Sequence, residues 1–594
     1  MTKVKYKLKN VPISQFSLNF LGEYLERLGI KKVESFIGKP SKEDEEPWQN
    51  LENIREAVEL LHNGFVNNKK FFLQVDSDAD GYTSSSIFYG FFKELFPNAD
   101  IEYRLHDGKE HGVMLNTIPV GVDIVVLPDS GSMQFDEQEE LSQNNIKVVI
   151  LDHHNVENPI SFPGVVVVNN QLSPNFSNKA LSGAGIVYKT IQAYSEIYNI
   201  DSKIYQKYAD LAALGIIADM MDTRTLDNNY IIQKGLNNIT NPMFRAILEK
   251  QQFSIEKSGA DLDSPTKITI AFYVAPLINA VIRFGTPEEK VELFRGFIER
   301  DTVQIVETEY RGETRRENFY DYVSRIATNV RARQNREKEK SMEFLSKRIE
   351  ENNLQNNQLL IVTVSKDDEV VVPQTITGLV AMELLKKYKK PTLVLRPKVA
   401  DDGTLIYAGS GRGKSNGDFT SLFQVLKESN LCEYVEGHNM AHGVAIKAAN
   451  IPLVIDHMND VLSNISFDID EMEVDYVFSN GSINPQMLTE FGGAMHLYGN
   501  GIPQPKFGFE LNLASSAIRF VGKKQNTLSF NVGGVGFVKF GAEEIIAKIQ
   551  ENPSTMYKFT LVGRAQINEW QGKKTPQIMI DEIDVEPIGL ADLF

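Results

Sequence analysis

The chain of 594 residues is longer than one hydrophobic core usually serves, so we expect three or four domains. Hydrophobic residues make up 42% and charged residues 24%, which is typical of a globular protein and excludes an intrinsically disordered one. The only cysteine, Cys432, excludes a disulfide framework and a thiolate zinc site. The net charge of −17 weighs against a general nucleic-acid coat protein, although metal-binding carboxylates contribute to that count.

The chain carries no recognisable targeting or membrane signal. Its basic start, Met1–Lys7, is not followed by the apolar core of a signal peptide. No apolar run approaches the ~20 residues that a membrane-spanning helix needs. We therefore expect a cytoplasmic protein with no membrane partner.

Residues 1–48 form an N-terminal segment. Its acidic, proline-bearing part, Lys39–Pro47, has the composition of a linker or loop. Residues 49–302 then alternate helical periodicity, as in Ser84–Leu95, with short β-branched runs. Such alternation predicts an α/β domain with a mostly parallel sheet. The predicted strands of this domain are Phe71–Val75, Val122–Leu127, Lys147–Leu151 and Val165–Val168.

Acidic and imidazole side chains follow three of these predicted strands. The carboxyl ends of parallel strands lie along one edge of a sheet, where open α/β folds place their ligands. We therefore expect the three groups to meet in one crevice. They are Asp76, Asp78 and Asp80 after the first strand, Asp129 after the second, and Asp152, His153 and His154 after the third.

The spacing of these acids indicates a divalent cation. Asp76, Asp78 and Asp80 would share one face of an extended backbone, and their mutual repulsion would raise their pKa values. A bound cation removes that repulsion, and oxygen ligands with one or two imidazoles suit manganese or magnesium better than zinc. Asp219 follows the apolar stretch 211–218. It either ends a helix or supplies a further ligand, and we favour the ligand.

Residues 303–352 carry dense charge at helical spacing and predict a long connecting helix. Its charged face either contacts water or faces DNA, and the sequence leaves both open. The basic residues of this segment include Arg325, Arg331, Arg333, Arg336, Lys338, Lys340, Lys347 and Arg348.

A second α/β unit is expected over residues 353–462, with strands near Leu359–Val364 and Thr392–Leu395. It contains two glycine-flanked segments, 409–413 with Ser410 and Arg412, and 436–443 with His438. Glycines that free backbone N–H groups beside Ser, Arg and His are typical of a cradle for a phosphate or nucleotide. We expect these side chains to bind substrate.

Residues 463–594 contain short β-like runs separated by Gly, Pro and Asn turns, which predicts a small β-barrel. Phe520, Lys523, Lys524 and Trp570 would suit base stacking and backbone contacts on its surface, although each aromatic could equally belong to a core. The predicted strands are Ala517–Val521, Thr527–Val532, Gly536–Phe540, Lys558–Leu561 and Gln577–Ile580.

The ordered motifs Asp-x-Asp-Ala-Asp-Gly, Asp-x-Gly, Asp-His-His and Gly-x-x-Ala-Asp resemble the four signatures of the DHH phosphoesterases, and Asp76-Ser77-Asp78 resembles the start of the RecJ branch. The resemblance covers roughly residues 50 to 590. It implies a DHH domain, a connecting helix, a DHH-associated domain and an OB-like barrel. It also implies catalytic roles for Asp152 and His154, of which His154 would orient or protonate groups at the scissile phosphate. The implied ligands of one or two manganese or magnesium ions are Asp76, Asp78, Asp80, Asp129, His153 and Asp219.

Further substrate contacts follow from the same resemblance. The segment with Arg104, Lys109 and His111 is similar to a family loop that faces a 5′ phosphate, although His111 replaces the usual Tyr; it could also be a plain surface loop. Asn279 and Arg283 match a family Pro-x-x-Asn-Ala-x-Gly-Arg motif in which Ile282 replaces Gly. They bind substrate or tie the domain to its neighbour.

The resemblance implies a metal-dependent 5′-to-3′ exonuclease that hydrolyses single-stranded DNA to 5′-mononucleotides in recombination and repair. Its partners would be single-stranded DNA and a single-stranded-DNA-binding protein or a helicase, and the chain would be a monomer. Two alternatives stay open: a DHH phosphodiesterase for oligonucleotides or cyclic dinucleotides, and a non-catalytic DNA-binding scaffold. The first needs no charged connecting helix or terminal barrel, and the second would have lost metal ligands that this chain retains.

Overall fold

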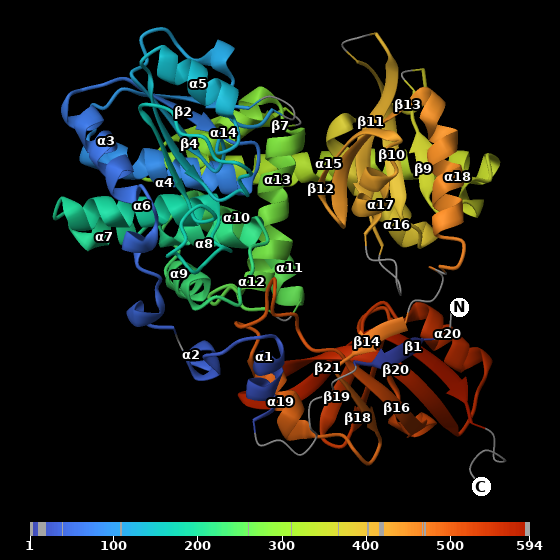
Figure 1. Ribbon diagram of the computed structural model, residues 1–594. Helices are drawn as coiled ribbons and strands as arrows, with labels where there is room; N and C mark the ends of the chain where they lie inside the picture. Colours follow the sequence, from blue (N-terminus) through green and yellow to red (C-terminus); the bar gives the residue numbers. More distant parts are fainter. Residues whose placement is uncertain are drawn as a thin grey trace. The chain divides into compact units, whose positions relative to one another are not determined.

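The structure is a computed structural model that describes residues 4–9, 19–38, 40–106, 110–258, 260–310, 312–365, 367–400, 403–414, 421–465, 467 and 471–588 (Figure 1). The fold divides into two compact units. The first contains Met1–Asn279, Pro287–Arg325 and Glu471–Phe594. The second contains Ala280–Thr286 and Ile326–Asp470. The unit with the acidic motifs therefore also holds both ends of the chain.

A five-stranded parallel sheet forms the centre of the first unit, in the order β3-β2-β4-β5-β6. The three inner strands, β2, β4 and β5, have almost entirely buried side chains, because helices cover both faces of a parallel sheet. The predicted strands are confirmed, with ends shifted by one or two residues. The observed strands are β2 (Phe71–Val75), β3 (Ile101–Leu105), β4 (Ile124–Pro128), β5 (Lys147–Asp152) and β6 (Val165–Asn169).

The helices around this sheet carry the connections between strands and then build the rest of the α/β domain. They are α3 (Ile54–Val66), α4 (Ala79–Leu95), α5 (Phe135–Gln143), α6 (Gly183–Ile197), α7 (Ser202–Gln206), α8 (Ala209–Ala218), α9 (Leu226–Leu236), α10 (Pro242–Lys250), α11 (Gln252–Lys257), α12 (Lys267–Thr269), the π-helix η4 (Ile270–Val274), α13 (Ala275–Phe284) and α14 (Pro287–Ile298). Within the described residues, one stretch, Lys267–Phe284, is long and apolar enough to cross a membrane by length and composition, and 56% of it is buried inside the fold. Its burial is that of a core helix.

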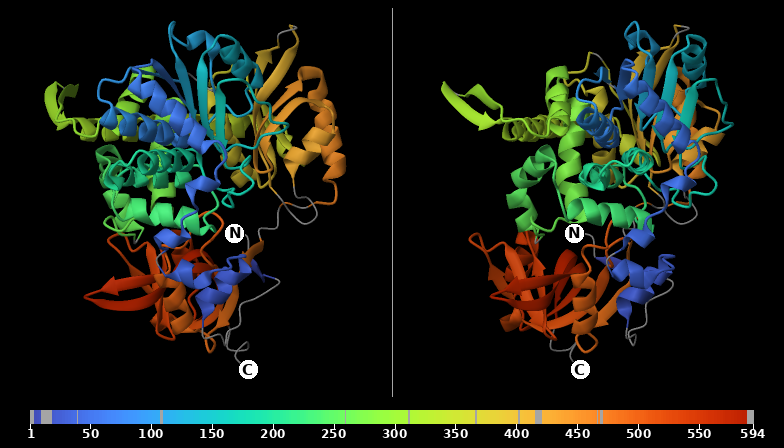
Figure 2. Two further views of the ribbon diagram at one scale, coloured as in Figure 1. Left: turned by 60° about the vertical axis from the view of Figure 1, so that its left-hand side comes forward. Right: turned by 90° about the vertical axis from the view of Figure 1, so that its left-hand side faces the viewer.

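The expected continuous helix over 303–352 is wrong in its first third. This part forms the hairpin β7 (Ile305–Tyr310) and β8 (Glu313–Asn318), and only then does α15 run from Phe319 to Glu351. Opposite charges face each other across the hairpin, as in the pair of Glu307 with Arg316. Figure 2 shows the yellow-green hairpin reaching outward from the catalytic domain. The same dense charge that suits a helix face thus also suits an exposed β-ribbon.

The second unit is a mixed five-stranded sheet in the order β12-β13-β11-β10-β9, in which only β9 and β10 are parallel. Two hydrophobic clusters cover its faces. Its strands are β9 (Leu360–Thr363), β10 (Thr392–Val399), β11 (Leu405–Arg412), β12 (Cys432–His438) and β13 (Ala441–Lys447), and its helices are α16 (Thr377–Tyr388), α17 (Leu422–Glu428) and α18 (Ile451–Val461).

The C-terminal part folds as a seven-stranded sheet in the order β15-β16-β20-β21-β19-β18-β17. Among the residues that the structure describes, β15 and β17 are edges, so the hydrogen-bonded ladder does not close into the ring that a complete barrel has. The strands are β15 (Tyr476–Ser479), β16 (Phe507–Ala514), β17 (Arg519–Val521), β18 (Thr527–Val532), β19 (Val535–Lys539), β20 (Met556–Trp570) and β21 (Lys573–Pro587), with helices α19 (Pro485–Gly493) and α20 (Glu543–Glu551).

The N-terminal segment packs on both parts of the first unit. Strand β1 (Lys5–Leu8) pairs in parallel with β14 (Glu471–Val474), and α1 (Phe20–Arg27) packs its Tyr24 ring against Phe491 of α19. The segment then passes through α2 (Val33–Ile37) to the catalytic domain. The predicted linker Lys39–Pro47 is instead an ordered contact over its described residues, because Glu45 is buried there beside Lys189.

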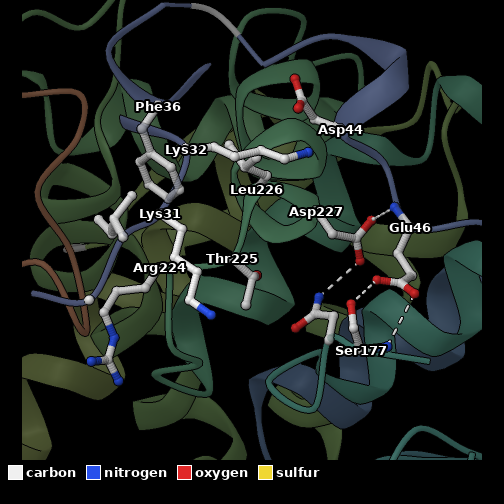
Figure 3. Close-up of a pocket in the computed structure, with 13 residues that line it drawn as sticks. Lys31, Lys32, Phe36, Asp44, Glu46, Ser177, Arg224, Thr225, Leu226 and Asp227 are labelled. Carbon is white, nitrogen blue, oxygen red and sulfur yellow. Dashed lines mark hydrogen bonds between the residues drawn. The ribbon is translucent and has the colours of Figure 1, made fainter. Parts of the chain in front are cut away.

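Figure 3 shows how this contact is made. A cavity of about 340 Å³ separates the N-terminal segment from the start of α9. On one side of it the backbone N–H of Glu46 donates to Asp227, while Ser177 donates to the Glu46 carboxylate and Asn178 donates to Asp227. The carboxylates on this side therefore serve to attach the segment.

Candidate metal centre

The first acidic motif lies where β2 turns into α4. Asp76 follows the strand directly, Asp78 caps the helix by accepting a hydrogen bond from Gly81 N at 3.0 Å, and Asp80 lies in the first turn. The expected extended run is therefore wrong, because the helix begins at Ala79. The helical turn directs Asp80 toward the start of α6.

Asp80 is held by the N-terminus of α6. Its carboxylate accepts hydrogen bonds from Ser182 Oγ at 2.9 Å, Gly183 N at 2.7 Å and Ala184 N at 3.1 Å. A side chain at Gly215 of α8 would collide with the same carboxylate, and one at Gly183 would collide with Asp129. Glycine at both positions lets three helices and a strand end approach one another closely.

Asp129, His153 and Asp219 meet at the edge of the sheet. Asp129 follows β4 in the left-handed region, with φ of 66°, and is buried. His153 Nε2 lies 3.1 Å from Asp129 Oδ1, 3.5 Å from Asp219 Oδ2 and 4.0 Å from Asp80 Oδ2. The sequence left open whether Asp219 ends a helix or supplies a further ligand. In the structure it ends α8 and also belongs to the cluster.

This cluster is electrostatically unfavourable without a cation. Burial, and then the charges of Asp80, Asp78, Asp76 and Asp219, raise the pKa of Asp129 well above its ordinary value. Burial and the charges of Asp80 and Asp78 likewise raise the pKa of Asp219 to about 8. Asp129 Oδ1 is buried and accepts no hydrogen bond among the described residues. Repulsion of this kind is what a divalent ion relieves.

The pKa of Asp76 is shifted in the opposite direction, toward the charged form. Burial alone would raise its pKa, but hydrogen bonds from His106 and His111 and the charges of these imidazoles lower it to about 2. His111 Nδ1 lies 2.9 Å from the carboxylate, and Gly112 N donates to it at 3.2 Å. His106 was missed in the sequence. The sequence feature that could have identified it is a second histidine after β3, five residues before His111.

Asp152 and His154 form a hydrogen-bonded pair beside the cluster. His154 Nδ1 lies 2.7 Å from Asp152 Oδ1, and Ser132 N donates to Asp152 at 3.1 Å. Although burial disfavours its charged form, the bond to Asp152 raises the pKa of His154 to about 9. Burial opposes ionisation of Asp152 as well, yet His154 and Ser132 hold its pKa well below the usual range. His154 is thus an imidazolium at neutral pH, with about half of its side chain exposed.

The donor set fits one or two divalent cations. There are three groups of candidate ligands among the described residues, and within each group the ligand atoms lie within 4.8 Å of one another. The groups share residues, as expected for adjacent ions. Oxygen-rich ligation with an imidazole suits manganese or magnesium. All six predicted ligands belong to these groups, which are Asp129, Asp152, His153 and His154; Asp80, His153 and Asp219; and Asp76, Asp78 and Asp129.

The predicted substrate residues of the first unit lie at different distances from the cluster. His111 contacts Asp76 directly. Arg104 donates to Glu110 at 2.7 Å and lies 3.3 Å from His106, so it adjoins the centre through that imidazole. Asn279 lies on α13, where its Oδ1 is buried without a hydrogen-bond donor among the described residues. Lys109 lies outside the described residues.

In the second unit, Arg412 and Ser410 lie on β11 beside the start of α16. Ser410 Oγ lies 2.9 Å from Thr377 Oγ1, and a side chain at Gly378 would collide with the Arg412 guanidinium. Burial and the charge of Arg283 lower the pKa of Arg412, so these two cations lie near each other. His438 ends β12 opposite Ala441, and Trp570 ends β20 opposite Lys573. The structure describes the backbone of these two residues but not their side chains.

Comparison with known proteins agrees with this architecture. The N-terminal domain of the DHH family matches residues 70–216, and the RecJ OB domain matches residues 474–582. YorK, provisionally named a single-strand DNA-specific exonuclease of the SPbeta prophage of Bacillus subtilis (strain 168), is 34% identical over 96% of this chain and 97% of its own. The single-stranded-DNA-specific exonuclease RecJ of the same strain is 23% identical over 99% of this chain and 70% of its own.

A solved structure shares the fold. RecJ from Thermus thermophilus, crystallised with Mn²⁺, superposes with a TM-score of 0.68 at 21% identity, over 99% of this chain and 80% of that chain. The sheet, its edge cluster of carboxylates and imidazoles, and the match to the DHH model define a DHH-family protein. With the RecJ OB domain and the 34% identical relative, the chain belongs to the RecJ branch of that family.

Proposed function

We propose that the protein is a metal-dependent exonuclease that hydrolyses single-stranded DNA from its 5′ end and releases 5′-mononucleotides. The observation that carries the proposal is the repulsive cluster at Asp129 and Asp219, which needs divalent cations, in a chain that also has an OB domain. OB folds bind single strands through stacking and backbone contacts. The names of the related RecJ and YorK proteins agree with it.

One or two manganese or magnesium ions would be held by Asp76, Asp78, Asp80, Asp129, His153 and Asp219. When bound, such ions polarise a phosphoryl oxygen and lower the pKa of a coordinated water toward neutrality. The protein fixes this chemistry in place. Backbone N–H groups of α6 orient Asp80, and His106 and His111 orient Asp76, so that each carboxylate presents its remaining lone pairs to the centre.

His154 is proposed as the group that donates a proton at the scissile phosphate. Asp152 occupies its Nδ1, which leaves Nε2 to carry the transferable proton. Because the pair keeps His154 protonated at neutral pH, the imidazolium stabilises charge on the phosphate and can protonate the leaving 3′ oxygen. Asp152 is therefore a positioning residue as well as an electrostatic one.

Phosphate groups of the DNA strand are proposed to bind cationic side chains that lie outside the metal centre. Arg412, Arg283 and Ser410 of the second unit offer two guanidinium groups and a hydroxyl beside the N-terminus of α16, a combination that suits a phosphate. Arg104, Lys109, His111, Asn279, His438 and Trp570 are proposed as further substrate contacts.

The setting proposed for this activity is DNA recombination and repair in the cytoplasm. The protein would act as a monomer and would receive its substrate from a single-stranded-DNA-binding protein or a helicase. A DHH phosphodiesterase for small substrates is the weaker alternative, because it has no use for an OB domain of the kind found at residues 474–582.

The test is cleavage of single-stranded DNA by matched aspartate variants in manganese. Asp129→Ala should lower turnover by orders of magnitude, since it removes a buried carboxylate of the centre. Asp136→Ala, on the exposed side of α5, should retain the rate of the unchanged protein and serves as the control. An Asp129→Ala protein with near-full nuclease activity would refute the proposed centre.

A further inference from the structure

A second cavity lies within the first unit, between the catalytic domain and the OB domain. Its volume is about 310 Å³. One wall comes from the end of α8 and from α12 with η4, and the other from the segment 499–506 that precedes β16. Its lining includes Met220, Lys267, Phe272, Lys506 and Arg564.

The two walls are fastened to each other by direct hydrogen bonds. Thr223 donates to the carbonyl of Asn500 from its backbone N at 2.9 Å and from its Oγ1 at 2.8 Å, and the Asn500 side chain donates to the carbonyl of Met220. Gly501 has φ of 81°, and a side chain there would collide with Asp222. The cavity is thus a built feature of the first unit.

Two large apolar side chains at this cavity are exposed. Phe272 is 71% exposed and Met220 is 58% exposed, although burial of either would be favourable. Phe272 lies on the five-residue π-helix η4, and π-helical turns occur frequently at functional sites. An exposed aromatic ring and a thioether at the mouth of a cavity are suited to stacking against a planar ligand.

The polar groups of the cavity suit a ligand that carries both acceptors and negative charge. Lys267 is buried and donates to Asn229 Oδ1 at 2.8 Å, which uses one of the three N–H groups of an ammonium. Burial lowers its pKa to about 7. Lys506 and Arg564 add cationic groups, and Arg564 is paired with Asp581. A nucleotide meets these requirements, with carbonyl acceptors on its base and a charged backbone.

The cavity also adjoins the metal centre along the chain. Met220 directly follows Asp219, so their Cα atoms are about 3.8 Å apart. One wall of the cavity thus includes the residue directly after a proposed metal ligand. The OB domain supplies the opposite wall, which favours a single strand over a small molecule as the occupant.

We propose that this cavity is a nucleobase subsite, in which Phe272 and Met220 stack against one base of the single strand and Lys267 donates to its acceptors. The inference rests on the proposed nuclease function and assigns it a specific base contact near the point of cleavage. The subsite reads the presence of a base through its planar face, so it tolerates all four bases.

The experiment measures equilibrium binding of single-stranded oligonucleotides in EDTA, by fluorescence anisotropy, so that no cleavage occurs. Each oligonucleotide carries one abasic sugar, moved one position at a time from the 5′ end. The unchanged protein should bind about fivefold to 100-fold more weakly when the abasic sugar reaches one particular position, the range expected for loss of one base–aromatic stack. Phe272→Ala should bind the intact strand correspondingly more weakly and should lose the dependence on that position.

Two further variants complete the test. Phe253→Ala removes an equally exposed phenylalanine, 78% exposed on α11, and should keep the full positional dependence. Phe272→Tyr keeps the aromatic ring and should also keep the full positional dependence. A Phe272→Ala protein with unchanged affinity and positional dependence would overturn the subsite alone. An unchanged protein that binds no single-stranded DNA at all would instead overturn the proposed function.

Discussion

At the scale of single residues, the metal centre is a balance of carboxylates in opposite states. Asp76 is stabilised as an anion by two imidazoles, whereas burial and the charges of Asp80 and Asp78 force Asp129 and Asp219 toward protonation. Asp152 and His154 form an ion pair at the rim of the same centre. The metal-free protein therefore carries an electrostatic cost that metal binding removes.

This balance predicts how stability depends on pH in the metal-free protein. The pKa of Asp219 is about 8 when folded and about 3.9 when unfolded, so the folded state binds more protons between these values and its stability falls as pH rises. The pKa of His154, raised to about 9, acts in the same direction above its unfolded value of about 6.5. The lowered pKa of Asp76 costs stability only below about pH 4.

Urea unfolding in EDTA should accordingly show a loss of about 3 kcal/mol from Asp219 between roughly pH 6 and pH 9, to which the partly exposed His154 adds a smaller loss. Asp219→Asn should reduce this loss because it removes one of the two titrating groups. Stability that is constant or rises over this range in the metal-free protein would contradict the electrostatic description.

The imidazolium of His154 makes a second prediction at this scale. His154→Ala should lower the turnover of single-stranded DNA about 10²-fold to 10⁴-fold, the usual contribution of general acid catalysis. Its manganese stoichiometry, measured by calorimetry, should stay unchanged, because His153 is the imidazole that faces the carboxylate cluster. In the unchanged protein the rate should fall as pH rises through about 9. Loss of bound manganese in His154→Ala would show that this residue is a ligand instead.

The residues of the centre were predicted from sequence better than their supporting contacts. The ligands follow strands, and the edge rule for parallel sheets brings them together from sequence alone. His106 was missed because its partner Asp76 lies thirty positions earlier, on a neighbouring strand, and no local pattern links them. The holding of Asp80 by Gly183 and Ala184 likewise depends on tertiary packing.

At the scale of elements, a buried charge cluster fixes the N-terminal segment to the catalytic domain. Lys189 of α6 donates to Asp227 at 2.8 Å, to the Glu46 carbonyl at 2.7 Å and to Glu45 at 3.3 Å, and its side chain is fully buried. Removal of one partner from such a group leaves uncompensated charge in a low-dielectric interior.

Lys189→Ala should therefore destabilise the protein by about 3–5 kcal/mol in urea unfolding, since buried Asp227 loses its cation and buried Glu45 keeps only its ion pair with Lys42. Lys7→Ala is the matched control, because its ion pair with Glu473 is exposed on both sides and should contribute about 1 kcal/mol or less. Equal, small effects of the two substitutions would show that the segment is not held by this cluster.

The hairpin β7–β8 shows where element prediction from sequence fails. Its residues alternate charge with both β-like and helical spacing, and most of its described residues are exposed, so no continuous buried face reveals the period. The helix α15 was predicted correctly beyond it from dense charge at helical spacing. In the structure its apolar residues Val323, Ala327 and Val330 also recur at helical spacing and are buried.

At the scale of the whole molecule, one compact unit joins the metal centre, the OB domain and the N-terminal segment that packs on both. The proposed base subsite requires an unpaired base, which a single strand offers and a duplex does not. No sequence pattern indicated this cavity, because Lys267 and Phe272 on one wall are more than 200 residues away from the other wall at 499–506.

The most direct test follows the products of single-stranded DNA labelled at its 5′ end in one reaction and at its 3′ end in another, in manganese. A blunt duplex of the same sequence is the control substrate. The 5′ label should appear at once as a mononucleotide, the 3′ label should shorten step by step, and the duplex should resist. Release of the 3′ label first, or degradation of the duplex as fast as the single strand, would contradict a 5′-directed exonuclease for single-stranded DNA.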